Sequence, residues 1–307
     1  SGLPALMPDT PTILIVNGSA GSGRARRVAG RVADRLRAVG PAIDVIATAS
    51  AADASDLAQR HAGQGRRAIL VCGGDGTVHH VCNAIAGSET AMGIIPAGRA
   101  NDLAGALRLP RRPEQLASLY APFLTGEREP VAMDLGRAGD RLFCTVAAFG
   151  VDSAISGRAL EQGGGKAGRL GYLSGAIAEL AQYRPQWARL SGDFGAREVD
   201  VLLCATANTP VYGGWYRIAP DASPYDGLFH VCVIREMSRL RAMTMLPRVI
   251  AGTHVPDPCV EILVTRELRI ETREPSPLFA DGEPLGDAPV TLAVERSALR
   301  ILAGPPE

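Results

Sequence analysis

The chain has 307 residues, which exceeds the size at which a single hydrophobic core usually stops growing, so we expect two domains. Hydrophobic residues make up 46% of the sequence and charged residues 21%, and this balance excludes an intrinsically disordered protein. The formal net charge is zero and Lys166 is the only lysine, so the composition argues against binding to nucleic acid.

No apolar run approaches the roughly 20 residues that a membrane-spanning helix needs, and the first residues lack the pattern of a signal peptide. The six cysteines show no metal-binding CxxC spacing and lie mostly in apolar runs, which is typical of reduced core residues. We therefore expect a soluble, cytoplasmic protein without a transmembrane segment.

Strands and helices alternate along the first 130 residues. The predicted strands cover 12–16, 43–47, 69–71 and 92–95, and the predicted helices cover 24–39, 53–61, 78–85, 102–107 and 113–126. Alternation of this kind predicts a parallel sheet with helices on both faces, and right-handed crossovers bring the loops after the strands to one edge.

The loop Gly73–Thr77, with the sequence GGDGT, lies between a predicted strand and a predicted helix. Its glycines let the backbone approach a ligand closely, and the turn places N–H groups and the positive end of a helix where phosphate binds. Asp75 supplies a carboxylate for a metal or water, and Thr77 a hydroxyl for phosphate or helix capping. The interpretation is a nucleotide phosphate loop, and the alternative is an ordinary Gly-rich turn.

Two further loops rich in glycine, 17–23 and 96–102, follow the first and fourth predicted strands. They bring Asn17, Asn101 and Asp102 to the same edge of the sheet as the GGDGT loop. Three such loops at one edge are more specific evidence for a binding site than any one of them, because a purely structural turn need not recur at the same edge.

Strand-like runs dominate after residue 131. They cover 142–148, 199–205, 228–234, 260–264, 268–272, 290–294 and 299–302, with helical interruptions over 166–183 and 237–251. This pattern predicts an antiparallel, β-rich second domain over 131–307, after a first domain over 1–130.

The helix predicted over 166–183 carries Leu170, Leu173, Ile177 and Leu180 on one face. We expect this stripe to pack on the second domain, and the alternative is a mobile wall of a lipid site that touches a membrane.

Together these motifs resemble the diacylglycerol kinase catalytic-domain superfamily, which includes soluble bacterial diacylglycerol kinases, YegS-like lipid kinases, sphingosine kinases and ceramide kinases. The resemblance rests on the loop 17–23, GGDGT, Asn83, PAGRAND at 96–102, AFGVD at 148–152, IAPDASPYDG at 218–227 and DGEP at 281–284. It implies an α/β fold in which a parallel-sheet nucleotide domain, like that of phosphofructokinases and NAD kinases, precedes an antiparallel β-rich domain, with the active site in the interdomain cleft.

The resemblance also implies which residues bind ATP and Mg²⁺. The residues implied for ATP are Asn17, Ser19, Gly21, Arg24, Thr48, Gly73, Gly74, Asp75, Gly76, Thr77, Val78, His79, Gly98, Arg99 and Asn101. The residues implied for Mg²⁺ are Asp75, Asp102, Ser223, Asp226 and Leu228. The chain departs from the family at Arg99, where threonine is usual, and at His79-His80, where Asn-Glu is usual.

Asp281 and Glu283 are the candidates for the general base that removes the proton of an acceptor hydroxyl. One carboxylate would accept the proton while the other orients it or binds Mg²⁺, and we prefer Asp281 slightly as the base. The alternative is an exposed Asp-Gly hairpin turn, which is common.

The predicted function is therefore transfer of the γ-phosphoryl group of ATP to a lipid alcohol of the diacylglycerol, ceramide or sphingoid type. The lipid substrate would be met at the inner membrane surface, where the protein binds peripherally, and a homodimer is left open. Two alternatives remain: a kinase of a soluble small molecule, like NAD kinase, and a lipid-binding or regulatory homologue with impaired catalysis.

Overall fold

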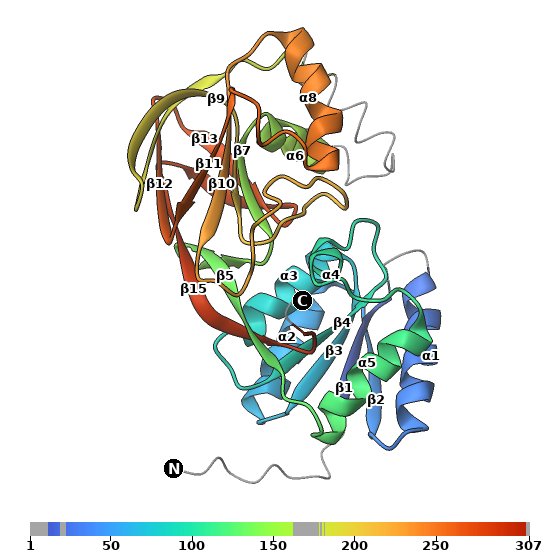
Figure 1. Cartoon of the computed structure of the whole chain (residues 1–307). Helices are drawn as coiled ribbons and strands as arrows, with labels where there is room; N and C mark the ends of the chain where they lie inside the picture. The colour runs from blue at the N-terminus through green and yellow to red at the C-terminus, as the bar shows by residue number, and fades with distance from the viewer. Residues whose placement is uncertain (1–11, 19–22, 162–177, 179, 181, 305–307) are drawn as a thin grey trace. The chain divides into compact units, whose positions relative to one another are not determined.

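A computed structural model describes residues 12–18, 23–161, 178, 180 and 182–304 of the chain (Figure 1). The chain divides into two compact units, one made of residues 1–133 with 297–307 and the other of residues 134–296. The bulk of the helix predicted over 166–183, including Leu170, Leu173 and Ile177, lies outside the described residues, as do Ser19 and Gly21.

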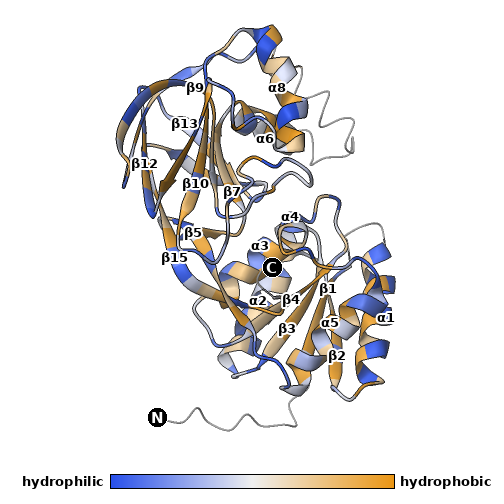
Figure 2. Cartoon of the chain, viewed as in Figure 1, coloured by the Kyte–Doolittle hydropathy of each residue, from blue (hydrophilic) through white to orange (hydrophobic). Residues whose placement is uncertain are grey.

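The first unit contains the parallel sheet that the sequence predicts. Its strands are β1 Thr12–Asn17, β2 Ile43–Thr48, β3 Ala68–Gly73 and β4 Ala91–Pro96, in the order β4-β3-β1-β2. All of β3 is buried, which explains why it is a continuous apolar run without polar alternation. Figure 2 shows the same hydrophobic character along β3 and β4.

Helices cover this sheet on both faces (Figure 1). They are α1 Arg24–Arg37, α2 Ala51–Gly63, α3 Asp75–Ile85, α4 Asp102–Ala106 and α5 Pro113–Thr125. α1 packs beside α5, and α2 beside α3. α5 begins with Pro113 at its first turn and ends at Gly126, which has a left-handed backbone conformation, as the sequence predicts. α3 begins at Asp75, within the GGDGT loop and three residues earlier than predicted.

A strand from the end of the chain completes the first unit. Strand β15, Val290–Ile301, pairs with β12 at its start, and its last residues Arg300 and Ile301 pair in parallel with Ala91 and Met92 of β4. Leu302 then joins the core beneath the sheet. Hydrophobicity alone predicts two separate strands here because the polar residues 295–297 interrupt the apolar run.

The second unit is antiparallel and rich in strands, as predicted. Its strands are β5 Val131–Ala138, β6 Arg141–Phe143, β7 Val146–Gly150, β8 Gln186–Gly192, β9 Gly195–Ala207, β10 Phe229–Arg235, β11 Val260–Thr265, β12 Glu267–Thr272, β13 Ser276–Ala280 and β14 Glu283–Ala288. The order β14-β13-β7-β9-β8-β12-β15 is extended by β10, which pairs with β9 and β11, while β5 pairs with β15 and β6. The helices α6 Val151–Glu161 and α8 Arg239–Ala251 accompany these strands.

Several of these elements are missing from the prediction for physical reasons. β14 contains Pro284 and Gly286, which occur in strands mainly at sheet edges, and β14 is an edge strand. The strand predicted over 142–148 is divided into β6 and β7 at Cys144 and Thr145. Among the described residues, none of the helices has the length and apolar character needed to cross a bilayer.

Candidate functional site

The carboxyl ends of four parallel strands form one rim of the first unit. Asn17 pairs with Thr48 across β1 and β2, and Gly73 pairs with Pro96 across β3 and β4, so the loops that follow these strands leave the sheet at the same edge. This is the edge at which α/β sheets bind their ligands. The structure therefore brings together Asn17, Thr48, the GGDGT loop and the PAGRAND loop, as the sequence predicts.

Close contact between two loops explains the glycines at this rim. A Cβ atom at Gly98 would lie 2.5 Å from the Cα atom of Gly74, and one at Gly73 would lie 2.6 Å from the Cβ atom of Thr77. The N–H groups of Ala97 and Gly98 donate to the carbonyl of Gly73 at 2.9 and 3.2 Å. Gly74 and Gly98 are needed because the two backbones meet here, whereas a Cβ at Gly73 would clash with the Thr77 side chain; none of the three glycines has a positive φ.

The Asp75 carboxylate ties the two loops together. It accepts hydrogen bonds from the backbone N–H groups of Asn101 at 2.9 Å and of Asp102 at 2.6 Å. Asn101 has a left-handed backbone (φ 55°), and its side chain closes the loop by exchanging hydrogen bonds with the backbone of Gly98. In this structure Asp75 thus anchors the loop that carries Arg99, a task the sequence did not indicate.

The amino end of α3 points its backbone at the rim. The N-cap residue of this helix is Gly74, which has no side chain to cap the first N–H groups. The Thr77 hydroxyl, inside the first turn, accepts a hydrogen bond from the side-chain amide of Asn17 at 2.9 Å. Uncapped N–H groups and the positive helix end suit an anion such as phosphate. Val78 is buried against the sheet, so only its backbone is available to a ligand.

Two arginines stand near the rim, and a third was not predicted. Arg99 and Arg24 are exposed, and no hydrogen bond or ion pair joins the side chain of either to another described residue. The guanidinium of Arg26 lies against Gly18, because a Cβ atom there would be 3.0 Å from its Nη2 atom. Side chains of a helix lean toward its amino end, which brings Arg26, in the first turn of α1, to this loop.

The histidines of α3 are adjacent in sequence but lie on different sides of the helix. The rings of His79 and His80 are 5.7 Å apart between centroids, with an interplanar angle of 89°. Asn83 donates to the backbone carbonyl of His79 at 3.0 Å, one turn away. In the described part of the chain, no set of three or more His, Cys, Asp or Glu side chains gathers as metal ligands.

Asp281 and Glu283 are two positions apart in the second unit, but Asp281 lies in a turn and Glu283 is the first residue of β14. Asp281 and Gly282 have φ angles of 53° and 84° and form a two-residue turn between β13 and β14, so the two carboxylates are not on one extended segment. The Asp281 carboxylate accepts from the N–H groups of Cys144 (2.7 Å) and Thr145 (2.9 Å) and from the Thr145 hydroxyl (2.6 Å). The Glu283 side chain is half-buried and makes no hydrogen bond to a described residue.

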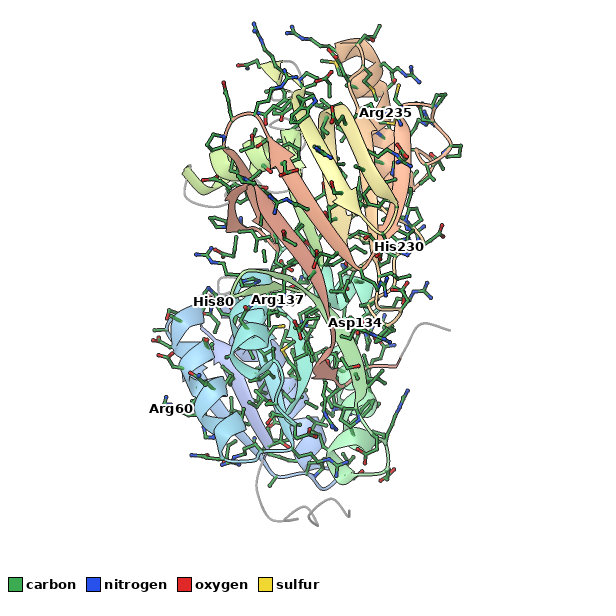
Figure 3. The ribbon with its side chains drawn as sticks, turned by 90° about the vertical axis from the view of Figure 1, so that its left-hand side faces the viewer. Arg60, His80, Asp134, Arg137, His230 and Arg235 are labelled. Carbon is green, nitrogen blue, oxygen red and sulfur yellow. The ribbon has the colours of Figure 1, made fainter. Side chains whose placement is uncertain are left out.

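A buried polar network continues from this turn to the loop before β10. Asn208, fully buried, donates from its backbone to the carbonyl of Thr145 and from its side chain to the carbonyls of Cys144 and Asp134, each at 2.9 Å. Asp134, labelled in Figure 3, in turn accepts from the N–H of Gly227 at 2.8 Å. Sequence reasoning missed both residues, because neither a single carboxylate within a strand nor a single amide after one belongs to a recognisable motif.

The loop with Ser223, Asp226 and Leu228 is held by an Asx turn. Asp226 Oδ1 accepts from the N–H of Leu228 at 2.9 Å, and Asp226 Oδ2 lies 3.5 Å from Nε2 of His230. The side chain of Asp226 is partly exposed. One carboxylate among loop carbonyls is an all-oxygen donor set, which fits the preference of Mg²⁺.

An apolar pocket lies within the second unit. The empty space is about 560 Å³ and is partly open to solvent, and it is lined by residues of α6, β9, β10 and α8 together with Leu180, Tyr212 and Tyr216. Asp152 is the one acidic residue among its described lining residues. Burial, with a smaller contribution from the Asp152 charge, raises the pKa of Tyr216 to about 12, so its phenol stays protonated.

Two family models match most of the chain. Residues 11–137 match the diacylglycerol kinase catalytic domain, and residues 145–303 match the YegS C-terminal NAD kinase beta sandwich-like domain. A diacylglycerol kinase of Mycobacterium tuberculosis is 32% identical over 297 residues, which are 94% of this chain and 93% of the relative. A probable lipid kinase YegS-like of Chromohalobacter salexigens is 32% identical over 90% of this chain and 88% of the relative.

Solved structures share the fold. A crystal structure of a diacylglycerol kinase from Bacillus anthracis str. Sterne matches 96% of this chain and 97% of its own, with a TM-score of 0.73 and 20% identity. This similarity supports the fold alone. The chemistry has to be inferred from the residues of the rim and of the second unit.

Proposed function

Since the chain belongs to the family of bacterial diacylglycerol kinases and YegS-like lipid kinases, we propose that it transfers the γ-phosphoryl group of ATP to the hydroxyl of a lipid alcohol. Diacylglycerol is our first choice of substrate because it is the lipid that the names of several relatives give. Ceramide and sphingoid bases are the other lipid alcohols to test. The first unit binds ATP and the second binds the lipid in this proposal.

The apolar pocket of the second unit is the observation that carries the proposal. It is concave and its described lining is almost wholly apolar, as in sites that bind apolar small molecules. An apolar lining can take an acyl chain but offers little to a sugar or nucleotide, which needs many hydrogen bonds. Asp152 and the Tyr216 phenol are polar groups that could orient the hydroxyl end of such a lipid. The alternative of a soluble substrate therefore has less support.

The rim of the first unit supplies groups suited to the phosphates of ATP. Backbone N–H groups at the start of α3 and the cations Arg24, Arg26 and Arg99 would neutralise phosphate charge. Arg99 extends from the loop that Asp75 holds, so its position depends on that carboxylate. This arrangement gives Arg99 a use that differs from that of the threonine usual in the family.

In the proposed chemical step, the acceptor hydroxyl oxygen bonds to the γ-phosphorus, the bond from that phosphorus to the β–γ bridging oxygen breaks, and ADP leaves. Asp281 receives the hydroxyl proton. The hydrogen bonds from Cys144 and Thr145 fix the orientation of this carboxylate, and Glu283 is the second candidate for the base.

Mg²⁺ would supply charge neutralisation for the phosphate groups when it is bound. The Ser223–Leu228 loop would hold it through Asp226 and loop carbonyls, and the buried network through Asp134 fixes that loop. Asp75 and Asp102 remain proposed members of a metal and water network. The Asp75 carboxylate also accepts from the N–H groups of Asn101 and Asp102, so it contributes by positioning the PAGRAND loop as well.

A kinase assay over a panel of acceptors tests the proposal. The purified chain is incubated with γ-labelled ATP, Mg²⁺ and either diacylglycerol, ceramide, sphingosine, NAD or no acceptor. We expect label in a lipid product, with diacylglycerol phosphorylated best. Label in NAD alone would establish the soluble-substrate alternative, and binding of lipid without any transfer would establish the regulatory one.

A further inference from the structure

The outward side of helix α8 carries a stripe without charge. Leu240 is 75% exposed and Met243 is 36% exposed. They are two of the five large apolar side chains that are exposed to solvent among the described residues. Thr244, Pro247 and Ala251 are exposed on the same side of the helix, at spacings of three and four from these residues. We call these five residues the α8 stripe.

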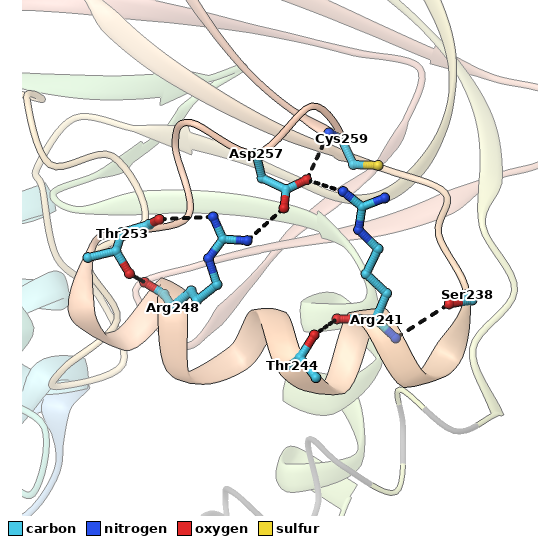
Figure 4. Close-up of polar contacts among 7 residues, drawn as sticks. All are labelled: Ser238, Arg241, Thr244, Arg248, Thr253, Asp257 and Cys259. Atoms are coloured by element: carbon cyan, nitrogen blue, oxygen red, sulfur yellow. Dashed lines mark hydrogen bonds and ion pairs between the residues drawn. The ribbon is translucent and has the colours of Figure 1, made fainter.

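Arginines border the α8 stripe on both sides. Arg239 lies on one side, and its side chain makes no hydrogen bond or ion pair with a described residue. On the other side Arg241 and Arg248 both bind the carboxylate of Asp257, at 2.7 and 2.6 Å, as Figure 4 shows. Asp257 also accepts from the N–H of Cys259 at 3.0 Å, so its position is fixed from the backbone. Three arginines and one carboxylate leave this border with a net positive charge.

The inward side of the same helix lines the apolar pocket. Ala242, Met245, Leu246 and Val249 of α8 are among the residues that enclose it. α8 is thus apolar on two opposite sides, and arginines occupy the positions between them. A surface helix of an ordinary globular domain has a polar outward side instead.

We propose that the α8 stripe is the surface by which this protein binds a bilayer containing anionic lipids. Leu240 and Met243 enter the boundary between headgroups and acyl chains, and Arg239, Arg241 and Arg248 meet the phosphate groups around them. This inference rests on the proposed function in one respect: the pocket on the inward side of α8 would then receive its lipid from the membrane that the outward side contacts.

A second copy of the chain is a less suitable occupant of this surface. A symmetric dimer brings the same patch of each copy together, so the bordering arginines of both copies would face each other. Like charges at close range oppose such association, whereas an anionic bilayer offers the complementary charge. The stripe is also one helix wide, which is small for a stable protein interface.

Cosedimentation with vesicles tests the proposal without requiring turnover. Wild-type protein should partition onto vesicles of phosphatidylcholine with phosphatidylglycerol and much less onto phosphatidylcholine alone. The variant Leu240→Ser/Met243→Ser should lose roughly tenfold or more of this partitioning, since each side chain loses burial of apolar area. Arg239→Gln should lose roughly fivefold on anionic vesicles, the effect of about one basic residue near a charged surface.

A matched control uses two exposed valines that lie outside α8, in β2 and β11. Val45 and Val264 are 42% and 41% exposed, and Val45→Ser/Val264→Ser should bind vesicles as the wild type does. Equal binding by wild type and the Leu240→Ser/Met243→Ser variant would overturn the proposal, as would indifference to phosphatidylglycerol. A dimer in size-exclusion chromatography that only the α8 variant loses would show that a second copy covers the stripe.

The test of the α8 stripe can be distinguished from the test of the proposed lipid kinase activity. Vesicle binding that depends on the α8 stripe, in a protein that phosphorylates no lipid, supports the docking surface and contradicts the kinase proposal. Phosphorylation of a short-chain, dispersed diacylglycerol by a protein that ignores vesicles supports the kinase proposal and contradicts the docking surface. Unchanged melting temperatures of the variants show that folding explains neither result.

Discussion

Replacement of Gly98 by alanine should weaken ATP binding, because this glycine permits the closest contact at the rim. The added methyl carbon would lie 2.5 Å from the Cα atom of Gly74 and 3.0 Å from Oδ1 of Asn101. Carbon atoms in contact normally stay about 3.5–4.0 Å apart, so the two loops must separate by about 1 Å or more. Both sides of this contact are backbone, and no side-chain rotation can relieve it.

The cost can be bounded from the contacts that the separation disturbs. Overpacking of this kind typically costs about 1–3 kcal/mol. The same movement stretches the hydrogen bonds from Asn101 and Asp102 to Asp75, which now measure 2.9 and 2.6 Å. If ATP requires the loops in their present positions, the Kd for ATP should rise roughly 5- to 150-fold, which corresponds to the same energy. The free energy of unfolding should fall by about 1–3 kcal/mol.

Gly105→Ala is the matched control. Gly105 lies in α4, a few residues further along, and a Cβ atom there would meet no other atom within 4 Å. Alanine is favoured over glycine in a helix by up to about 1 kcal/mol, so this variant should be equal to the wild type or slightly more stable. Isothermal titration with ATP and urea denaturation measure both effects. Wild-type affinity and stability in Gly98→Ala would refute the argument that loop contact shapes the rim.

Three further predictions concern the second unit. Asp281→Asn should lower kcat by about 10²–10⁴-fold and Glu283→Gln by less, and the reverse ranking in the lipid kinase assay would transfer the role of base to Glu283. Asp226→Ala should raise the Mg²⁺ concentration for half-maximal activity at least about tenfold and remove any stabilisation by Mg²⁺ in thermal unfolding; an unchanged response to magnesium would contradict the metal loop. His254 Nε2 lies 3.0 Å from the carbonyl oxygen of Ile218, and burial lowers the pKa of this histidine below its usual value. The contribution of His254 to the free energy of unfolding is therefore complete above about pH 6.5, and it is lost as the pH falls through the lower pKa of the folded state. The denaturant midpoint, measured across this pH range, should rise with pH. His254→Gln should reduce this dependence of the midpoint on pH.

The rim of the first unit was largely predictable from the sequence, because its signals are local. An apolar run, a cluster of glycines and a new helical period specify a strand, a turn and a helix, and alternation specifies the parallel sheet. The prediction could not include the contact of Gly74 with Gly98 or the bonds from Asp75 to the PAGRAND loop. These join residues more than 20 positions apart, and no periodicity encodes such a pair.

The second unit was predictable in class but not in detail. Asp281 was selected as one of two neighbouring carboxylates, yet what distinguishes it from Glu283 in the structure is its hydrogen bonds with Cys144 and Thr145, which are far away in the chain. Asn208 was not selected at all, since one amide at the end of a long apolar strand has no motif around it. Buried polar networks depend on which strands pair, and strand order in an antiparallel unit is not written in the hydrophobic pattern.

The course of β15 has a consequence for synthesis on the ribosome. Arg300, Ile301 and Leu302 complete the edge of the first unit at β4, although the other strands of that sheet lie within the first 96 residues. While the second unit is still being translated, the hydrogen-bonding edge of β4 has no native partner, and exposed strand edges invite pairing with other chains. Nascent chains arrested between residues 140 and 296 should therefore aggregate more readily than the completed protein. A peptide containing residues 297–304, supplied in trans, should reduce that aggregation.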